Sequence, residues 1–235
     1  MSNNYFQFRQ FRIEQDRCAM KVTTDACIQG AWTPLMPEVK RVLDIGAGTG
    51  LLSLMLAQRN GDITVEAVEF DKPAAMQAAE NINASPWKDR VKVIDRDIRD
   101  HIAGSKYDLI ITNPPFFNNS LLGDKKSRNT ARHTLSLTYT ELLKSISVNL
   151  NEDGYFSILL PNTEYIQWKE LVGSSFYEVG RLSVSHTADA PVKRVVGLFA
   201  RKDTIITNEQ LVIKGGDNNY TRAFIDLLSP FYLDL

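Results

Sequence analysis

Short runs of apolar residues alternate with segments of helical periodicity along most of this chain. The apolar runs lie at Arg41–Ile45, Ile63–Phe70, Arg90–Asp95, Tyr107–Asn113 and Gly154–Pro161. Helical patterns follow the first, second and fourth of them, in "LLSLMLAQRN", "PAAMQAAENINA" and "YTELLKSISVNL". Continuous apolar strands separated by helices predict a parallel sheet that is covered on both faces.

The pattern changes towards the C-terminal end. There, "EVGRLSVSH" and "VVGLFARK" predict two strands, and the loop "TADAPVKR" between them is typical of an antiparallel hairpin. We therefore predict a Rossmann-like, doubly wound α/β fold, with a mostly parallel seven-stranded sheet that ends in this hairpin. No linker or repeat stands out, so we expect one domain over residues 1–235. Residues 1–35 would form an N-terminal cap, and residues 36–235 the core.

Composition and charge narrow the classes of function. The 235 residues are 43% hydrophobic, and the net charge of −1 argues against unspecific coating of nucleic acid or membrane, although it allows a local basic patch. No apolar run approaches the ~20 residues of a membrane span, and "MSNNYFQFRQFRIEQD" is too polar for a signal peptide. Cys18 and Cys27 have no CxxC spacing, and the three histidines are scattered. We expect a cytoplasmic protein that binds no metal and does not act at a membrane.

A glycine-rich segment, "DIGAGTG", joins the first predicted strand to its helix. Glycine lets a backbone pass close to a ligand, and ligands of such sheets bind where strands end. A dinucleotide site would read GxGxxG, but Leu51 stands where the last small residue should be. Asp44 would repel a pyrophosphate and could pair with an ammonium group. The segment therefore favours an amino acid attached to a nucleoside.

"VLDIGAGTG" resembles motif I of the class I S-adenosylmethionine-dependent methyltransferases. The resemblance implies S-adenosyl-L-methionine as the cofactor, with Gly46 and Gly48 along its methionine moiety. It also implies that Glu69, at the end of the second strand, accepts the ribose hydroxyls. Asp97 would lie near the adenine amine, with Ile98 beside the ring. Acidic residues after three successive strands make a purely structural role unlikely for the set.

The prolines of "ITNPPF" cannot continue the fourth strand, since each lacks an N–H. The segment resembles the (D/N/S)-P-P-(Y/F/W) motif of enzymes that methylate planar nitrogens. The Asn113 side chain, beside the methyl group, and the Pro114 carbonyl would accept the two N–H groups of the target amine. Pro115 stiffens the loop, and Phe116 can stack on the base. Catalysis would rest on positioning and on hydrogen bonds to developing charge, with the base turned out of its stack.

The segment Phe6–Trp32 resembles the N-terminal signature of the bacterial tRNA1(Val) (adenine(37)-N6)-methyltransferases. The likeness continues through "NPPFF", "ARHTLSLTYTELL" and "YTRAFIDLLSPFYL", so it covers nearly the whole chain. It implies methyl transfer to the exocyclic N6 amine of an adenine in tRNA, at adenosine 37 of tRNA1(Val). It also implies that the cap lies over the cofactor and substrate site, with roles there for Lys21, Thr24 and Asp25. Gln29 departs from the family pattern as a polar residue in the next helix.

Other acceptors stay open at this point. The same pocket chemistry suits an rRNA or DNA base amine or a protein glutamine amide, and a third reading is a non-catalytic RNA-binding scaffold. Intact Asp44, Glu69, Asp97 and Asn113 argue against the scaffold.

Cations gather directly after the proline elbow, in "GDKKSRNTARH". We expect this segment to bind RNA, with its cations on phosphates beside the target base: Lys125, Lys126, Arg128 and Arg132. Further cations occur in the N-terminal segment (Arg9, Arg12, Arg17 and Lys21) and at Lys193-Arg194. We expect the protein to meet its tRNA as a monomer.

Overall fold

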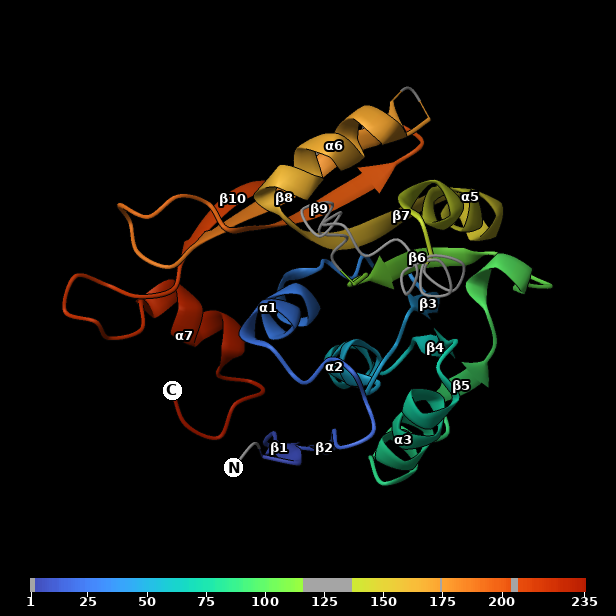
Figure 1. The fold of residues 1–235 in the computed structure, drawn as a ribbon, viewed down its shortest axis with the longest axis horizontal. Helices are drawn as coiled ribbons and strands as arrows, with labels where there is room; N and C mark the ends of the chain where they lie inside the picture. Colours follow the sequence, from blue (N-terminus) through green and yellow to red (C-terminus); the bar gives the residue numbers. More distant parts are fainter. Residues whose placement is uncertain (1–2, 116–136, 174, 204–206) are drawn as a thin grey trace, which may run out of the picture.

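An eight-stranded sheet runs through the molecule, with helices on both of its faces (Figure 1). The structure is a computed structural model, and it describes residues 3–115, 137–173, 175–203 and 207–235. The strand order is β10-β8-β9-β7-β6-β3-β4-β5. The strands are β3 (Arg41–Ile45), β4 (Thr64–Glu69), β5 (Val91–Asp95), β6 (Tyr107–Thr112), β7 (Leu150–Pro161), β8 (Tyr177–Ser185), β9 (Arg194–Ala200) and β10 (Thr207–Val212).

The five strands from β7 to β5 are parallel, and β9 lies antiparallel between β7 and β8. This confirms the Rossmann-like fold with its antiparallel hairpin. The strand order reverses at β3, which pairs with β4 on one side and with β6 on the other. In sheets of this kind, the carboxyl ends of the strands beside such a reversal form the ligand crevice.

The sheet has one strand more than predicted. Strand β10 pairs in parallel with β8 at the outer edge, with Glu209 opposite Leu182. Its sequence, "TNEQLV", shows neither an apolar run nor an alternation of polar and apolar residues, so the sequence carries little strand signal. A short two-stranded ribbon, β1 (Tyr5–Gln7) and β2 (Arg12–Glu14), also lies outside the predicted elements.

Two layers of helices cover the sheet (Figure 1). The helices on one face are α1 (Thr24–Trp32), α2 (Leu51–Arg59), α3 (Lys72–Asn83) and α7 (Arg222–Leu228), and those on the other are α5 (Tyr139–Asn149) and α6 (Asn162–Val172). Their starts follow local chemistry: the Asp71 side chain caps α3, and Thr138 forms a capping box with Glu141 at α5. Within the described residues, none of the helices has the length and apolar character to cross a membrane.

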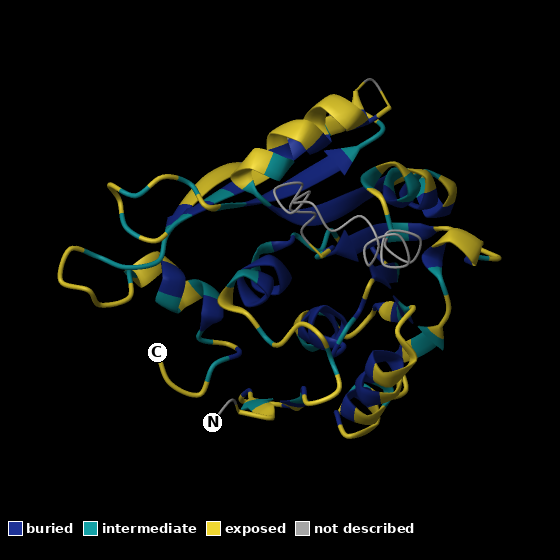
Figure 2. Cartoon of the chain, viewed as in Figure 1, coloured by how far each residue is buried: buried dark blue, intermediate teal, exposed yellow. Residues whose placement is uncertain are grey.

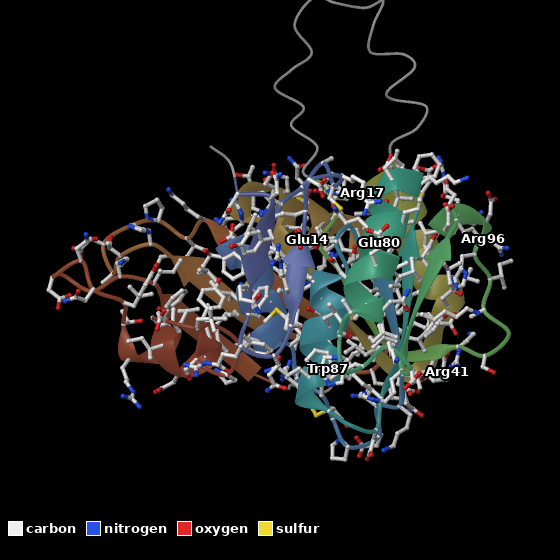
Figure 3. The ribbon with its side chains drawn as sticks, turned by 90° about the horizontal axis from the view of Figure 1, so that it is seen from below. Glu14, Arg17, Arg41, Glu80, Trp87 and Arg96 are labelled. Carbon is white, nitrogen blue, oxygen red and sulfur yellow. The ribbon has the colours of Figure 1, made fainter. Side chains whose placement is uncertain are left out.

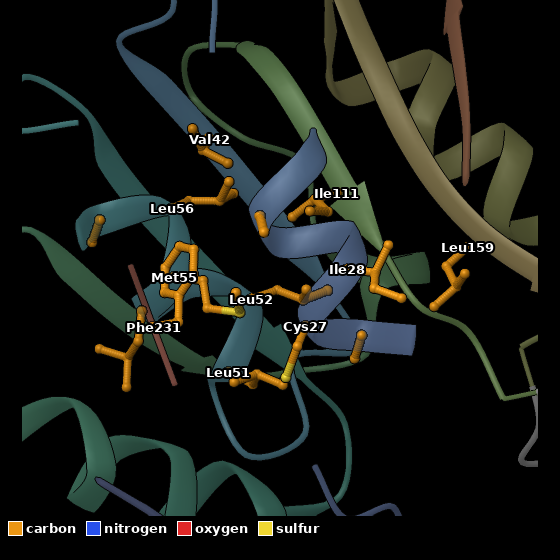
Figure 4. Packing of buried hydrophobic residues seen from close by; sticks show 14 of the residues in the cluster. Cys27, Ile28, Val42, Leu51, Leu52, Met55, Leu56, Ile111, Leu159 and Phe231 are labelled. Carbon is orange, nitrogen blue, oxygen red and sulfur yellow. The ribbon is translucent and has the colours of Figure 1, made fainter. Parts of the chain in front are cut away.

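Buried side chains form one apolar cluster on each face of the sheet. Figure 2 shows that most of the central strands and of α2 are buried. In the first, Ile28 of α1 packs among Leu52 and Met55 of α2 and Ile111 of β6 (Figure 4). Gly30 allows this close approach, because a Cβ there would lie 2.8 Å from the Met55 sulfur. The packing fixes α1 beside the end of β6.

The N-terminal segment is tied to α3 by side-chain amides. Asn81 accepts a hydrogen bond from the Glu14 N–H and donates to the Glu14 carbonyl, both at 2.9 Å. Gln77 accepts from the Arg17 N–H at 3.0 Å. These bonds hold the residues that follow Arg17 at the carboxyl ends of the strands.

Candidate active site

A cavity of about 270 Å³ opens at the carboxyl ends of β3, β4 and β6, beside the short 3-10 helix η1 (Ile98–Asp100). It brings together predicted site residues that are up to 69 positions apart in the chain. The predicted residues in its wall are Gly46, Gly48, Glu69, Asp97, Ile98, Asn113 and Pro115.

The glycine loop forms an open cradle on one side of the cavity. Gly46 and Gly48 have φ angles of 70° and 54°, in the left-handed region that side chains disfavour. A Cβ at either position would meet no atom within 4 Å, so there is open space beside this backbone. The loop is anchored to strand β4, since the Gly46 N–H donates to the Val68 carbonyl at 2.9 Å.

Glu69, the last residue of β4, organises the wall next to this cradle. One of its carboxylate oxygens accepts the Gly48 N–H at 2.8 Å, and the other accepts the Asp71 N–H at 2.8 Å. A carboxylate offers about four acceptor sites, so both oxygens can still receive a hydroxyl. The geometry therefore suits a ribose diol at this position.

Asp97 and Ile98 supply the next part of the wall. Hydrogen bonds from Arg99, two from its Nε at 3.0 Å and one from its backbone N–H at 2.9 Å, lower the pKa of Asp97 and keep it ionised. The carboxylate can accept from an exocyclic amine, and the buried Ile98 gives an apolar surface beside it. This pair fits an adenine.

Asp44 stands beneath the glycine loop and is not part of the cavity wall. It is fully buried, and one carboxylate oxygen accepts from the Ser53 N–H (3.1 Å) and hydroxyl (2.7 Å) in the first turn of α2. The other oxygen has no partner among the described residues. Burial raises the pKa of this carboxyl to about 7. An unpartnered buried oxygen of this kind suits a cationic ligand group.

The affinity for the cofactor should depend on pH through Asp44. If the cofactor's ammonium pairs with ionised Asp44, affinity should rise by up to tenfold per pH unit from pH 5.5 towards about 7. An α-amino group, with a pKa of about 7.7–8.0, stays charged over that window. The stability of the protein without ligand should depend on pH in the opposite direction. Because the pKa of Asp44 is higher in the folded than in the unfolded chain, the free energy of unfolding should fall as pH rises from about 4 to about 7.

Calorimetry at pH 6.5 in two buffers of different ionisation enthalpy should detect proton release on binding. Asp44→Asn should remove both the proton release and the pH dependence. An affinity that stays flat from pH 5.5 to 7.5 in the wild type would contradict the pairing.

Asn113 directly follows β6 and presents an amide to the cavity. Its Oδ1 is buried and has no hydrogen-bond partner among the described residues. The backbone before it is fixed from two sides: the Thr112 hydroxyl donates to the Ile45 carbonyl at 2.9 Å, and Gln29 Nε2 donates to the Thr112 carbonyl at 3.0 Å. Pro114, buried, and Pro115, exposed, follow. The polar Gln29 thus helps to set the end of β6.

Besides Asp44, three predicted cofactor contacts do not reach the cavity wall. Lys21 is exposed and donates to the Asn3 carbonyl at 3.2 Å, and Thr24 is the exposed first residue of α1. Asp25 pairs with Arg194 at 3.0 Å. Their roles stay predictions. Several further predicted residues lie outside the described residues: Phe116, Lys125, Lys126, Arg128 and Arg132.

The cavity wall also contains residues that the sequence analysis did not single out. Cys18 and Met20 come from the N-terminal segment, Phe70 follows Glu69, and Arg96 precedes Asp97. Phe70 is 51% exposed and Met20 is 39% exposed, so both offer apolar surface at the mouth. In the sequence, only their position next to predicted site residues indicates that they lie at the site, because their spacing does not distinguish them from other residues of the chain.

Taken together, the donor set matches S-adenosylmethionine part by part. There is an open glycine cradle for the methionine moiety, and beneath it lies the buried oxygen of Asp44 that no described residue pairs with. Glu69 can take the ribose, and Asp97 with Ile98 the adenine. In the described part of the chain, no three His, Cys, Asp or Glu side chains gather as metal ligands.

Solved structures share the fold. A structure described as a predicted O-methyltransferase from Agrobacterium tumefaciens superposes with a TM-score of 0.70 at 15% identity, over 88% of this chain and 96% of that one. A glycopeptide N-methyltransferase in complex with S-adenosylmethionine gives a TM-score of 0.57 at 12% identity, over 79% and 97%. The family model "Methyltransferase small domain" matches residues 32–158. The fold and the site thus define a Rossmann-like methyltransferase, and its cofactor is S-adenosyl-L-methionine.

Full-length relatives identify the family within this class. A protein of Tolumonas auensis named tRNA1(Val) (adenine(37)-N6)-methyltransferase is 44% identical over 99% of this chain and 98% of its own length. A protein of the same name from Dyadobacter fermentans is 41% identical over 98% of each chain. Another, from Escherichia coli, is 39% identical over 99% of this chain and 96% of its own length. The chain belongs to the family of tRNA1(Val) (adenine(37)-N6)-methyltransferases, which confirms the resemblance seen in its sequence.

Proposed function

We propose that this enzyme transfers a methyl group from S-adenosyl-L-methionine to the exocyclic N6 amine of adenosine 37 in the anticodon loop of tRNA1(Val). The observation that carries the proposal is the buried Asn113 Oδ1, which has no partner among the described residues, on a residue that lines the cavity beside the cofactor cradle. The relatives' shared name supplies the substrate.

The chemistry needs an aromatic amine held in a particular orientation. An amine on adenine is a weak nucleophile, because its lone pair is delocalised into the ring. Asn113 Oδ1 and the Pro114 carbonyl accept its two N–H groups, which holds the nitrogen nearer to tetrahedral and localises its lone pair for attack on the methyl carbon. The cofactor supplies an electrophilic methyl group when bound.

The protein's contribution is positioning and electrostatics. As the amine attacks, its nitrogen gains positive charge, and the hydrogen bonds to the two oxygens strengthen. Pro114 and Pro115 stiffen the elbow. Two hydrogen bonds, from Gln29 to the Thr112 carbonyl and from the Thr112 hydroxyl to the Ile45 carbonyl, fix the backbone that carries Asn113. No covalent intermediate with the protein is needed.

Several further properties belong to the same proposal. Residues 1–35 act as a cap over the cofactor and substrate site, and residues 36–235 form the catalytic core. The enzyme works as a cytoplasmic monomer without metal.

The direct test uses an unmodified tRNA1(Val) transcript with isotopically labelled S-adenosylmethionine. Nucleoside mass spectrometry should find labelled N6-methyladenosine, and nuclease mapping should place it at position 37. A transcript with guanosine at position 37 is the matched control and should stay unlabelled. Label on another base, on the control, or only on a glutamine-containing peptide would reject the proposal.

A further inference from the structure

Two adjoining hollows of about 330 and 480 Å³ follow strand β5, at the edge of the sheet. They share Arg41, Glu66, Lys92 and Val93 in their walls, and we term the two adjoining hollows together the β5 groove. Its cationic side chains are Arg41, Lys88, Arg90, Lys92 and Arg96. Two carboxylates line it, Glu66 and Asp89.

The cations of the β5 groove are poorly neutralised. Many cations elsewhere in the described chain form ion pairs, for example Arg17 with Glu80. Within the described residues, Lys88, Lys92 and Arg96 form no ion pair, and all three are exposed.

Three of the remaining charges of the groove already have partners. Arg90 donates to backbone carbonyls, among them that of Ile63 at 3.0 Å. Glu66 accepts from the Tyr107 hydroxyl at 2.7 Å and pairs with Arg41 at 3.4 Å. Asp89 is exposed and forms no ion pair among the described residues, so three unpaired cations stand against one unpaired carboxylate. A chain of net charge −1 thus carries a strip with an excess of positive charge here.

The β5 groove starts at the active site. Arg96 lines both the groove and the cofactor cavity. Figure 3 shows Arg96 near the carboxyl ends of the strands and Arg41 towards the opposite end of the sheet. Three strand spacings, roughly 14 Å, separate β5 from β6, which carries Asn113. From Lys92 to Arg96 the strand spans roughly 13 Å.

We propose that the β5 groove binds the sugar-phosphate backbone of the substrate RNA next to the target base, with Lys88, Lys92 and Arg96 on phosphates along the strand. The inference rests on the proposed function, because that function makes RNA the substrate. Cations that neutralise phosphates release counterions, which makes binding steeply dependent on salt. Lysines on an edge strand also occur for another reason, since they discourage pairing between sheets of different molecules.

The test is binding of the tRNA transcript across a salt series, with Lys88→Ala/Lys92→Ala in the full chain. We expect the Kd to rise roughly tenfold at low salt. The log–log slope should become shallower by about one unit per lost contact. Affinity for S-adenosylmethionine and turnover at saturating tRNA should not change. The matched control, Lys169→Ala/Lys202→Ala, removes the same charge from α6 and from the residues after β9, at the other side of the sheet. It should retain the wild-type slope.

A second measurement needs no variant. Acetylation of the wild-type protein should modify Lys88 and Lys92 less in the presence of tRNA, and Lys169 equally with and without it. An unchanged salt slope and Kd in the groove variant would overturn the inference. So would an equal loss of tRNA affinity in the control variant, or a groove variant that self-associates but binds RNA normally. These outcomes differ from failure of the proposed function, which would appear as a wild-type enzyme that does not methylate the tRNA.

Discussion

Replacing Asn113 by alanine should lower the turnover of methyl transfer by about 10²–10³-fold while cofactor affinity stays within about twofold. Losses of this size follow when one preorganised group that meets developing charge is removed. Because Asn113 Oδ1 has no partner among the described residues, the change breaks no described hydrogen bond of that atom, and the thermal midpoint should hold. Single-turnover kinetics at saturating tRNA, with calorimetry for the cofactor, would measure both effects.

The matched control is the same substitution at Asn162, an exposed residue at the start of α6, which should leave turnover unchanged. Asn113→Ala at the wild-type rate would mean that the amine is held elsewhere. A large loss of cofactor affinity would instead assign Asn113 to binding, since a change in turnover alone marks an interaction that is made in the transition state.

Several strands that the sequence predicts correctly share one physical property. Strands β3, β4, β6 and β7 lie inside the sheet with most of their residues buried or half-buried, so each contains an apolar run that stands out from its neighbours. Strand β10 lies at the edge and pairs through its backbone with β8, and among its residues 208–212, whose burial the structure describes, only Leu211 is buried. Backbone pairing leaves no trace in a pattern of side chains, and this is why the eighth strand was missed.

The candidate site divides in a similar way. Glu69, Asp97 and Asn113 were predictable because each lies at or just after the end of a strand, and parallel strands bring their carboxyl ends to one edge. The roles of Lys21 and Asp25 came only from the family resemblance, and neither residue lines the cavity. The positive strip of the β5 groove could not be predicted from the sequence, because it depends on which cationic side chains form ion pairs in the folded chain. Arg17 forms an ion pair with Glu80, while Lys92 forms none in the described part of the chain.

Replacing Glu69 by alanine should weaken S-adenosylmethionine binding by about 1–3 kcal/mol, which corresponds to roughly 5–150-fold in Kd. The change removes the acceptor for the ribose hydroxyls and leaves the N–H groups of Gly48 and Asp71 without their carboxylate. Glu69→Gln, which keeps one oxygen, should lose less. Glu38→Ala, at an exposed glutamate before β3, should lose nothing.

The Glu69 variant should differ from Asn113→Ala in its kinetics as well. If Glu69 holds the cofactor equally before and during the reaction, as we predict, saturating cofactor should restore most of the turnover, and the loss should appear in KM. For Asn113→Ala, no cofactor concentration should restore the rate. If Glu69→Ala binds with wild-type affinity, the ribose does not sit at the end of β4. If its turnover stays low at saturation, Glu69 acts on the reacting groups through the Gly48 loop, beyond holding the ribose.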